Sequence, residues 1–217
     1  MSLVLFTHPF SSYSQKVLIA LYENATPFDY RVLDNAQAFA ELEAVWPHKR
    51  FPVLLDDTVA VIESTIIIEH LALHHPGPVR LIPVDPQAAL QVRWLDRLFD
   101  NYVMTPMQKI VGDRLRTGPD RDAFGVAESR TRLDTSYRWL DVWMQNRPWA
   151  AGSEFSMADC AAAPSLFYAD WVHAIDPQFA HLRAYRQRLL QRASFARAVD
   201  EARPYRHLFP LGAPARD

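Results

Sequence analysis

Two adjacent hydroxyl side chains, Ser11 and Ser12, stand just ahead of a segment with helical spacing near the start of the chain. Apolar residues recur through residues 14–22 with the period of a helix. A hydroxyl beside the free N–H groups of a helix N-terminus can donate to a thiolate, which lowers the pKa of a bound thiol. Tyr13 offers a third hydroxyl inside the helix start. Simple capping of the helix by a serine is the alternative role of this pair.

A proline opens the apolar run at residues 52–55. Pro52 has no N–H, so it cannot donate to a strand ladder and belongs at an edge or in a special turn. A cis Phe51-Pro52 bond would turn the N–H and C=O of Phe51 out of the sheet, where they can pair with an extended peptide. An ordinary trans proline at a strand start is the alternative.

Glu63 and Ser64 lie between an apolar strand-like run and an apolar helical run. Ser64 is a favourable N-cap, and an exposed helix N-terminus attracts a carboxylate. Glu63 offers the opposite charge beside it. The pair can therefore hold the carboxylate and ammonium groups of an α-amino acid, or it can be only a capped helix with an acid in a favourable place.

The elements that would position these residues fit into the first 75 residues. Apolar periodicity predicts strands at 3–7, 29–33, 52–55 and 59–62, and helices at 14–22, 36–45 and 64–74. The order strand, helix, strand, hairpin, helix is typical of an α+β domain with helices on both faces of a mixed sheet.

A proline-rich segment separates this part from the remainder, with prolines at 76, 78, 83 and 86. Such a density favours a stiff, extended connection. We predict one domain at residues 1–76, a linker at 77–86, and an all-α domain at 87–217. Its helices are expected at 87–109, 121–145, 157–173, 179–191 and 195–201, with a kink or an end at Pro106.

The composition narrows the function classes. A net charge of -2, from 23 basic and 25 acidic residues, gives no electrostatic reason to expect nucleic acid as a partner. No apolar run approaches the roughly 18 residues that cross a bilayer, so we expect a cytoplasmic protein without a membrane partner. The histidines, His70 and His75 among them, have no metal-ligand companions at persuasive spacing, and no metal is expected.

The single cysteine, Cys160, excludes an internal disulfide and CxxC redox chemistry. It lies in an apolar helical run, where we expect a buried core thiol. The segment just before it, Ser156 to Asp159, is typical of a capping box, so we assign Asp159 a structural role and exclude it from catalysis.

Three of these signals, in this order, resemble the glutathione-binding half of the glutathione S-transferase family. They are the Ser11 loop leading into residues 16–21, the segment 47–54, and the segment 61–64. The serine-type classes are most similar, particularly the plant tau class and related bacterial members. The resemblance implies a thioredoxin-like N-terminal domain followed by an all-helical domain. One tau-like lysine is replaced by Gln37, and no cysteine stands near the first helix, which disfavours disulfide exchange.

The resemblance also implies roles for single residues. Ser11 would face the sulfur of glutathione, with Ser12 and Tyr13 as secondary candidates. The remaining glutathione-binding residues would be Arg50 near the glycine carboxylate, Phe51 and Pro52 at the cysteinyl residue, and Glu63 with Ser64 at the γ-glutamyl end.

The implied activity is that of a detoxifying glutathione transferase, with glutathione as co-substrate, no metal, and a homodimeric assembly. Bound glutathione would attack a hydrophobic electrophile as a thiolate. The lining of the electrophile pocket is expected from Phe10, Tyr102, Met104, Met107 and Trp171. Glutathione-dependent isomerisation, peroxide reduction, and a non-catalytic ligand-binding or interaction role are the alternatives.

Overall fold

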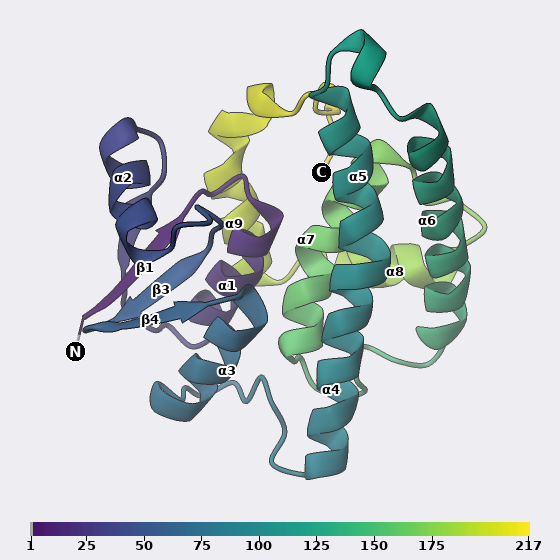
Figure 1. The fold of residues 1–217 in the computed structure, drawn as a ribbon. Helices are drawn as coiled ribbons and strands as arrows, with labels where there is room; N and C mark the ends of the chain where they lie inside the picture. Colours follow the sequence, from purple (N-terminus) through teal and green to yellow (C-terminus); the bar gives the residue numbers. More distant parts are fainter. Residues whose placement is uncertain (1) are drawn as a thin grey trace.

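A four-stranded mixed sheet organises the first part of the chain (Figure 1). The structure is a computed structural model, and it describes residues 2–217. The strands are β1 (Leu3–Thr7), β2 (Asp29–Val32), β3 (Val53–Asp56) and β4 (Val59–Ile62), in the order β2-β1-β3-β4. Strand β1 runs parallel to β2 and antiparallel to β3, and β3 pairs antiparallel with β4.

Side-chain alternation along the strands gives the sheet two apolar faces. Leu5 is buried with residues of α1 (Ser12–Glu23) and α3 (Ser64–His74), whereas its neighbour Phe6 is buried with residues of α2 (Ala36–Val45). Successive residues of a strand point to opposite faces, so one five-residue strand serves both layers. This is the predicted α+β arrangement, with helices on both sides of the sheet.

The remainder is helical, as predicted. It comprises α4 (Pro86–Leu98), the π-helical segment η1 (Phe99–Met104), α5 (Thr105–Arg114), the short 3-10 turn η2 (Gly118–Asp120), α6 (Ala123–Trp143), α7 (Met157–Val172), α8 (Ala180–Leu190), α9 (Ala193–Ala202) and the 3-10 segment η3 (Arg203–Leu208). Helix α7 lies at the centre of this part, and nearly all of its side chains are buried. None of the helices within residues 2–217 combines the length and apolarity that a membrane crossing requires.

The irregularity expected at Pro106 takes a particular form. The helix does not end there, because α4, η1 and α5 follow one another without a break. The π-helical turn precedes the proline, and the N–H of Thr105 bonds to the C=O of Asp100 instead of its usual partner. Proline cannot donate a helical hydrogen bond, and one extra residue per turn accommodates that loss.

Two structural expectations for α7 are confirmed. The Asp159 carboxylate is fully buried and accepts from the backbone N–H of Ser156, at 2.9 Å, and from the Tyr185 hydroxyl, at 2.6 Å. Cys160 beside it is a buried free thiol, and burial raises the pKa of that thiol well above its usual range. Both groups are therefore parts of the core.

Candidate functional site

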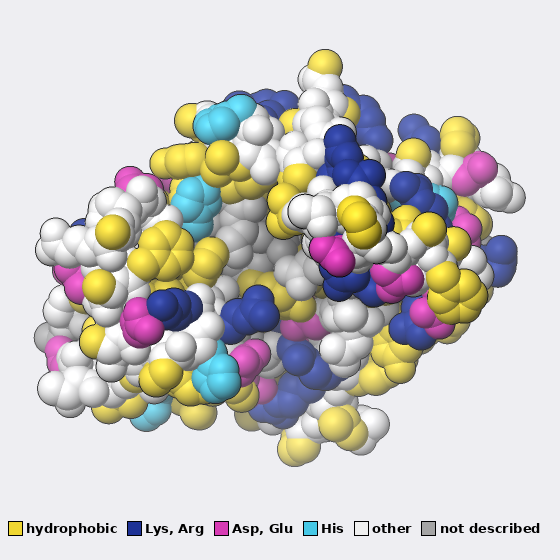
Figure 2. Space-filling view, turned by 45° about the horizontal axis from the view of Figure 1, so that its top comes forward, with side chains coloured by type: hydrophobic (Ala, Val, Ile, Leu, Met, Phe, Trp, Pro, Cys, Tyr) yellow, Lys and Arg dark blue, Asp and Glu magenta, His cyan; other side chains and the backbone are white. Residues whose placement is uncertain are grey.

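A cleft of about 610 Å³ lies between the sheet domain and the long helix formed by α4, η1 and α5. Figure 2 shows the surface hollowed between these two parts, with Lys and Arg side chains on both sides of the hollow. The cleft is lined by Ser11, Tyr13, Lys49, Arg50, Phe51, Pro52, Ile62, Glu63, Ser64, Arg97, Asp100, Asn101 and Gln108. The structure thus brings together Ser11 and every residue assigned above to glutathione binding.

Ser11 lies at the N-cap of α1, half-buried at the bottom of the first-domain wall. Its Oγ accepts from the backbone N–H of Ser14 at 3.4 Å. A hydroxyl that accepts one hydrogen bond keeps its own proton for another acceptor. Ser11 can therefore cap the helix and donate to a ligand atom in the cleft at the same time. Ser12, by contrast, is buried and does not line the cleft.

Tyr13 also lines the cleft, one residue inside α1. Burial raises the pKa of Tyr13 to about 12, and the nearby carboxylates of Asp100 and Glu63 add to the shift, against the opposite effect of Arg97. Its hydroxyl is protonated at neutral pH. Tyr13 can donate a hydrogen bond there, but it is a poor proton acceptor.

The segment before β3 supplies basic and backbone groups. The Phe51-Pro52 peptide bond is cis, so the reading as an ordinary trans proline is wrong. The strand ladder with β1 begins only at Val53, opposite Phe6, which leaves Phe51 outside the sheet pairing. Arg50 is exposed beside it, and the cleft is basic at this end.

Glu63 has the most unusual backbone of the site, with φ 74° and ψ 122°. A side chain at positive φ costs free energy, and such strain concentrates at functional positions. The expectation that Ser64 caps α3 is wrong by one residue: the helix begins at Ser64, Glu63 takes the cap position, and no side chain bonds to the first turn. The free N–H groups at the start of α3 therefore face the cleft beside the Glu63 carboxylate.

The second wall comes from the helical part and is polar. Arg97, Asp100, Asn101 and Gln108 project into the cleft from α4, η1 and α5. Behind them, the fully buried Lys16 of α1 forms ion pairs with Asp96 at 2.6 Å and Asp100 at 2.8 Å. Arg97 pairs with the same two carboxylates, so the cluster balances two positive against two negative charges.

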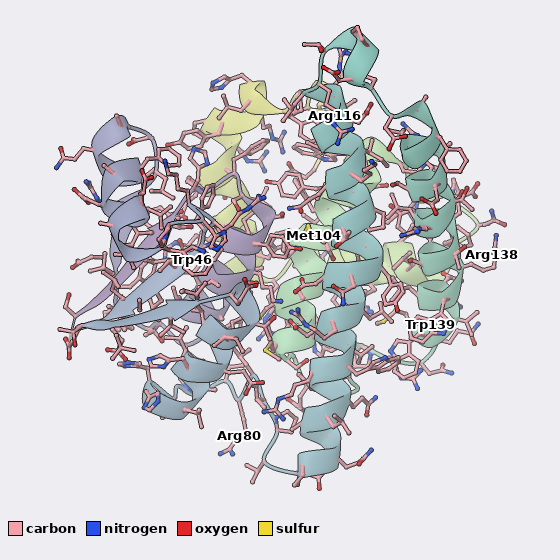
Figure 3. The ribbon with its side chains drawn as sticks, viewed as in Figure 1. Trp46, Arg80, Met104, Arg116, Arg138 and Trp139 are labelled. Carbon is pink, nitrogen blue, oxygen red and sulfur yellow. The ribbon has the colours of Figure 1, made fainter. Side chains whose placement is uncertain are left out.

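None of the five residues expected to form an apolar electrophile pocket lines this cleft. Met104 and Met107 are buried in the core of the helical part, and Figure 3 shows Met104 enclosed between helices. Tyr102 is 64% exposed, outside the cleft. Phe10 and Trp171 pack with Phe209 and Tyr168 into an aromatic cluster. Met104 and Met107 therefore serve the core, and the expected apolar lining is not found in this cleft.

Sequence reasoning missed the polar wall and one further cluster. Arg97, Asp100 and Asn101 lie in a stretch that the sequence predicts as one helix, in which Pro106 was the signal of an irregularity. The structure also places Asp56, His70 and His75 together, so the expectation that these histidines lack companions is wrong.

A thioredoxin-like domain joined to an all-helical domain, with a cleft between them, is the architecture of the glutathione S-transferase fold. The chain belongs to the glutathione S-transferase family: the profile of the glutathione S-transferase N-terminal domain matches residues 5–79, and that of the C-terminal domain matches residues 98–193.

Three similar proteins illustrate the range of the family. A glutathione S-transferase from Methylobacterium radiotolerans, solved in complex with glutathione sulfonate, is 28% identical, with a TM-score of 0.79 over 92% of this chain and 95% of that one. Glutathione S-transferase U25 of Arabidopsis thaliana is 27% identical, over 88% of this chain and 86% of the relative. FtsZ-localized protein A of Caulobacter vibrioides is 29% identical, over 75% of each chain.

Proposed function

We propose that the protein is a glutathione transferase that activates bound glutathione as a thiolate for attack on an electrophilic carbon. One observation carries the proposal: Ser11, Phe51, and the adjacent Glu63 and Ser64, from three separate segments, line a single cleft. The relative from Methylobacterium radiotolerans, solved with glutathione sulfonate, supports glutathione as the ligand.

Glutathione would bind along the first-domain wall. Its γ-glutamyl carboxylate would accept from the free N–H groups at the start of α3 and from Ser64, with its ammonium on Glu63. The unpaired backbone of Phe51 would bond the cysteinyl residue, and Arg50 would attract the glycine carboxylate. The thiol would then lie at the remaining end of this wall, beside Ser11.

Ser11 would lower the thiol pKa by donating its free proton to the thiolate. The positive end of the α1 dipole favours the same charge. A fall of one pKa unit corresponds to about 1.4 kcal/mol, which one or two charge-assisted hydrogen bonds supply. The protein would thus contribute pKa tuning and the proximity of the two reactants.

The electrophile would enter between Ser11 and the second wall. Because that wall is formed by Arg97, Asn101 and Gln108, it favours an electrophile that carries polar groups near its reactive carbon. The wholly hydrophobic electrophile expected from the resemblance fits this wall less well.

A thiol titration tests the proposal. Thiolate absorbance of the protein-glutathione complex is followed from pH 5 to pH 9 in the wild type and in Ser11→Ala. A thiol pKa below that of free glutathione, which rises in the variant, is the expected result. An unshifted pKa with binding intact would contradict the transferase proposal and favour a binding role, such as the name FtsZ-localized protein A suggests for that relative.

We also propose that the protein forms a homodimer through its helical part and the first domain of its partner. A tryptophan cluster on α4 and α6 supports this assembly, because Trp94 and Trp139 are each more than a third exposed while their rings stand 5.8 Å apart. Figure 3 shows Trp139 on the outside of α6, away from the cleft. Sedimentation equilibrium of the wild type and of Trp94→Glu tests it, with a shift from dimer to monomer expected.

A further inference from the structure

Three side chains with metal-ligating atoms converge at the end of the sheet domain opposite the cleft. His70 lies in the last turns of α3, His75 follows the end of that helix, and Asp56 is the last residue of β3. The Nε2 atoms of His70 and His75 stand 2.8 Å and 2.7 Å from the same oxygen, Oδ2 of Asp56. All three ligand atoms lie within 4.8 Å of one another.

We propose that Asp56, His70 and His75 form a Zn²⁺ site. Two imidazoles with one carboxylate are a ligand set that zinc uses, the fourth position being left to water or another ligand. Hard cations such as Mg²⁺ and Ca²⁺ prefer sites built from oxygen atoms, so the two imidazoles select against them.

The geometry is close to what a zinc ion requires. Zinc bonds of about 2.1 Å in a tetrahedral arrangement separate neighbouring ligand atoms by roughly 3.4 Å. The imidazole nitrogens of His70 and His75 therefore need to move away from Oδ2 of Asp56 by about 0.6 Å and about 0.7 Å. The three side chains retain between 14% and 17% exposure, which gives an ion a way in and leaves the rings room for this movement.

The surroundings favour a cation and hold the ligands in place. Helix α3 ends at His74, and the carbonyl end of a helix carries partial negative charge. The Asp57 carboxylate follows directly in the chain. Strand β3 and helix α3 are fixed to each other by buried Leu54, Ile67 and Leu71, so the ligands sit on a rigid frame.

The position of the site indicates a structural role. Ser64 opens α3 at the cleft, and His75 follows its other end, which places the two roughly 16 Å apart along the helix axis. A bound zinc ion would be too far away to polarise a thiol or an electrophile at Ser11. It would instead tie the end of β3 to the end of α3, just before the proline-rich connection.

Zinc binding to the full-length protein, freed of any affinity tag and of bound metal, tests the proposal. We expect one Zn²⁺ per chain in a competition titration with a chromophoric chelator, and the intense visible bands of tetrahedral Co²⁺ when cobalt replaces zinc. His70→Gln, His75→Gln and Asp56→Asn should each weaken binding about tenfold or more.

His74→Gln is the matched control. Its ring centroid lies 4.5 Å from that of His70, with the two rings tilted, yet it is no member of the cluster, so the variant should bind zinc like the wild type. Zinc at a hundredfold excess over its dissociation constant should raise the Tm of the wild type and of His74→Gln by about 5–10 °C, and that of the three ligand variants much less. Glutathione binding, measured in parallel, should be the same in every variant and shows that each is folded.

Three results would overturn the proposal. One is a wild type that binds no zinc, in which case Asp56, His70 and His75 would form hydrogen bonds with one another and no metal site. Another is stoichiometric binding that persists in all three ligand variants, which would place the ion elsewhere, for example at the His173 and Asp134 pair. The last is equal loss of binding in His74→Gln and His70→Gln.

Discussion

The two walls of the cleft differ in the kind of structure that positions their residues. The wall from the first domain consists of short local motifs. They are a helix cap at Ser11, a proline before strand β3 at Pro52, and a helix start at Ser64 that follows the strained Glu63. The wall from the helical part comes from one long helix, whose π-helical segment η1 carries Asp100 and Asn101. The first wall can hold the constant parts of a ligand, whereas the second is free to vary with the second substrate.

Lys16 connects the two walls. It belongs to α1, the helix that begins after Ser11, and its partners Asp96 and Asp100 belong to the long helix that forms the second wall. Its side chain is fully buried, so no water can replace it. The ion-pair cluster therefore links α1 to the long helix of the second wall.

Replacing Lys16 should give the largest loss of stability, because its ion pairs join α1 to the long helix of the second wall. Lys16→Met leaves Asp96 and Asp100 buried with Arg97 as their remaining cation. Breaking a buried ion pair costs about 3–5 kcal/mol, and urea denaturation should report a loss of that size at pH 8. Burial already raises the pKa of Asp100, and loss of Lys16 removes the strongest opposing influence.

The stability loss of Lys16→Met should also depend on pH, which gives a second test with the same variant. A carboxyl whose pKa is higher in the folded than in the unfolded state binds more protons when folded, so stability falls as pH rises through that range. The defect of Lys16→Met should thus be smaller at pH 5 than at pH 8. Arg132→Met, which breaks an exposed pair with Glu128, is the control and should cost less than about 1 kcal/mol. Equal losses in the two variants would show that the cluster does not hold the walls.

The contrast between the two walls also separates the residues that the sequence could predict from those that it could not. Strands β1 and β4 and helices α2 and α3 were predicted with their observed bounds, because each has clear periodicity and a polar or proline boundary. The first-wall residues were identifiable since each is a local motif. Arg97 and Asn101 were not, because no local motif marks them and the cleft forms only when the long helix packs beside the first domain. The trio of Asp56, His70 and His75 forms only when β3 and α3 pack together.

Replacing Ser11 should separate catalysis from binding within the first wall. We expect Ser11→Ala to lower kcat/KM for conjugation about tenfold or more, while glutathione affinity, measured by calorimetry, changes little. The contacts proposed for Phe51, Glu63 and Ser64 would account for the binding that remains. Ser12→Ala is the matched control, because Ser12 is buried outside the cleft and should leave the rate near that of the wild type. A larger rate loss from Ser12→Ala would transfer the thiolate-donor role to that residue.

Glu63 should show a conflict between stability and binding. Its φ of 74° is strained for any residue with a Cβ, and glycine removes that strain. We expect Glu63→Gly to be more stable than Glu63→Ala by about 1 kcal/mol in urea denaturation, although both lack the carboxylate and bind glutathione equally weakly. Ala60→Gly, in the exposed part of β4, should instead be less stable than the wild type. If Glu63→Ala equalled Glu63→Gly in stability, the backbone at residue 63 would carry no strain.

Replacing Tyr13 should give the smallest change in kcat/KM. The result shows whether a residue in contact with the second wall takes part in thiol activation. Its pKa of about 12, raised mainly by burial and further by Asp100 of the second wall, keeps the hydroxyl protonated from pH 6 to pH 9. It can neither accept the thiol proton in that range nor add a titration step to the rate profile. Tyr13→Phe should therefore change kcat/KM by no more than about fivefold and leave its pH profile unchanged, because one neutral hydrogen bond contributes about 1 kcal/mol to such a difference. A loss as large as that of Ser11→Ala would make the tyrosine hydroxyl the thiolate donor and join the second wall, through Asp100, to the activation of glutathione.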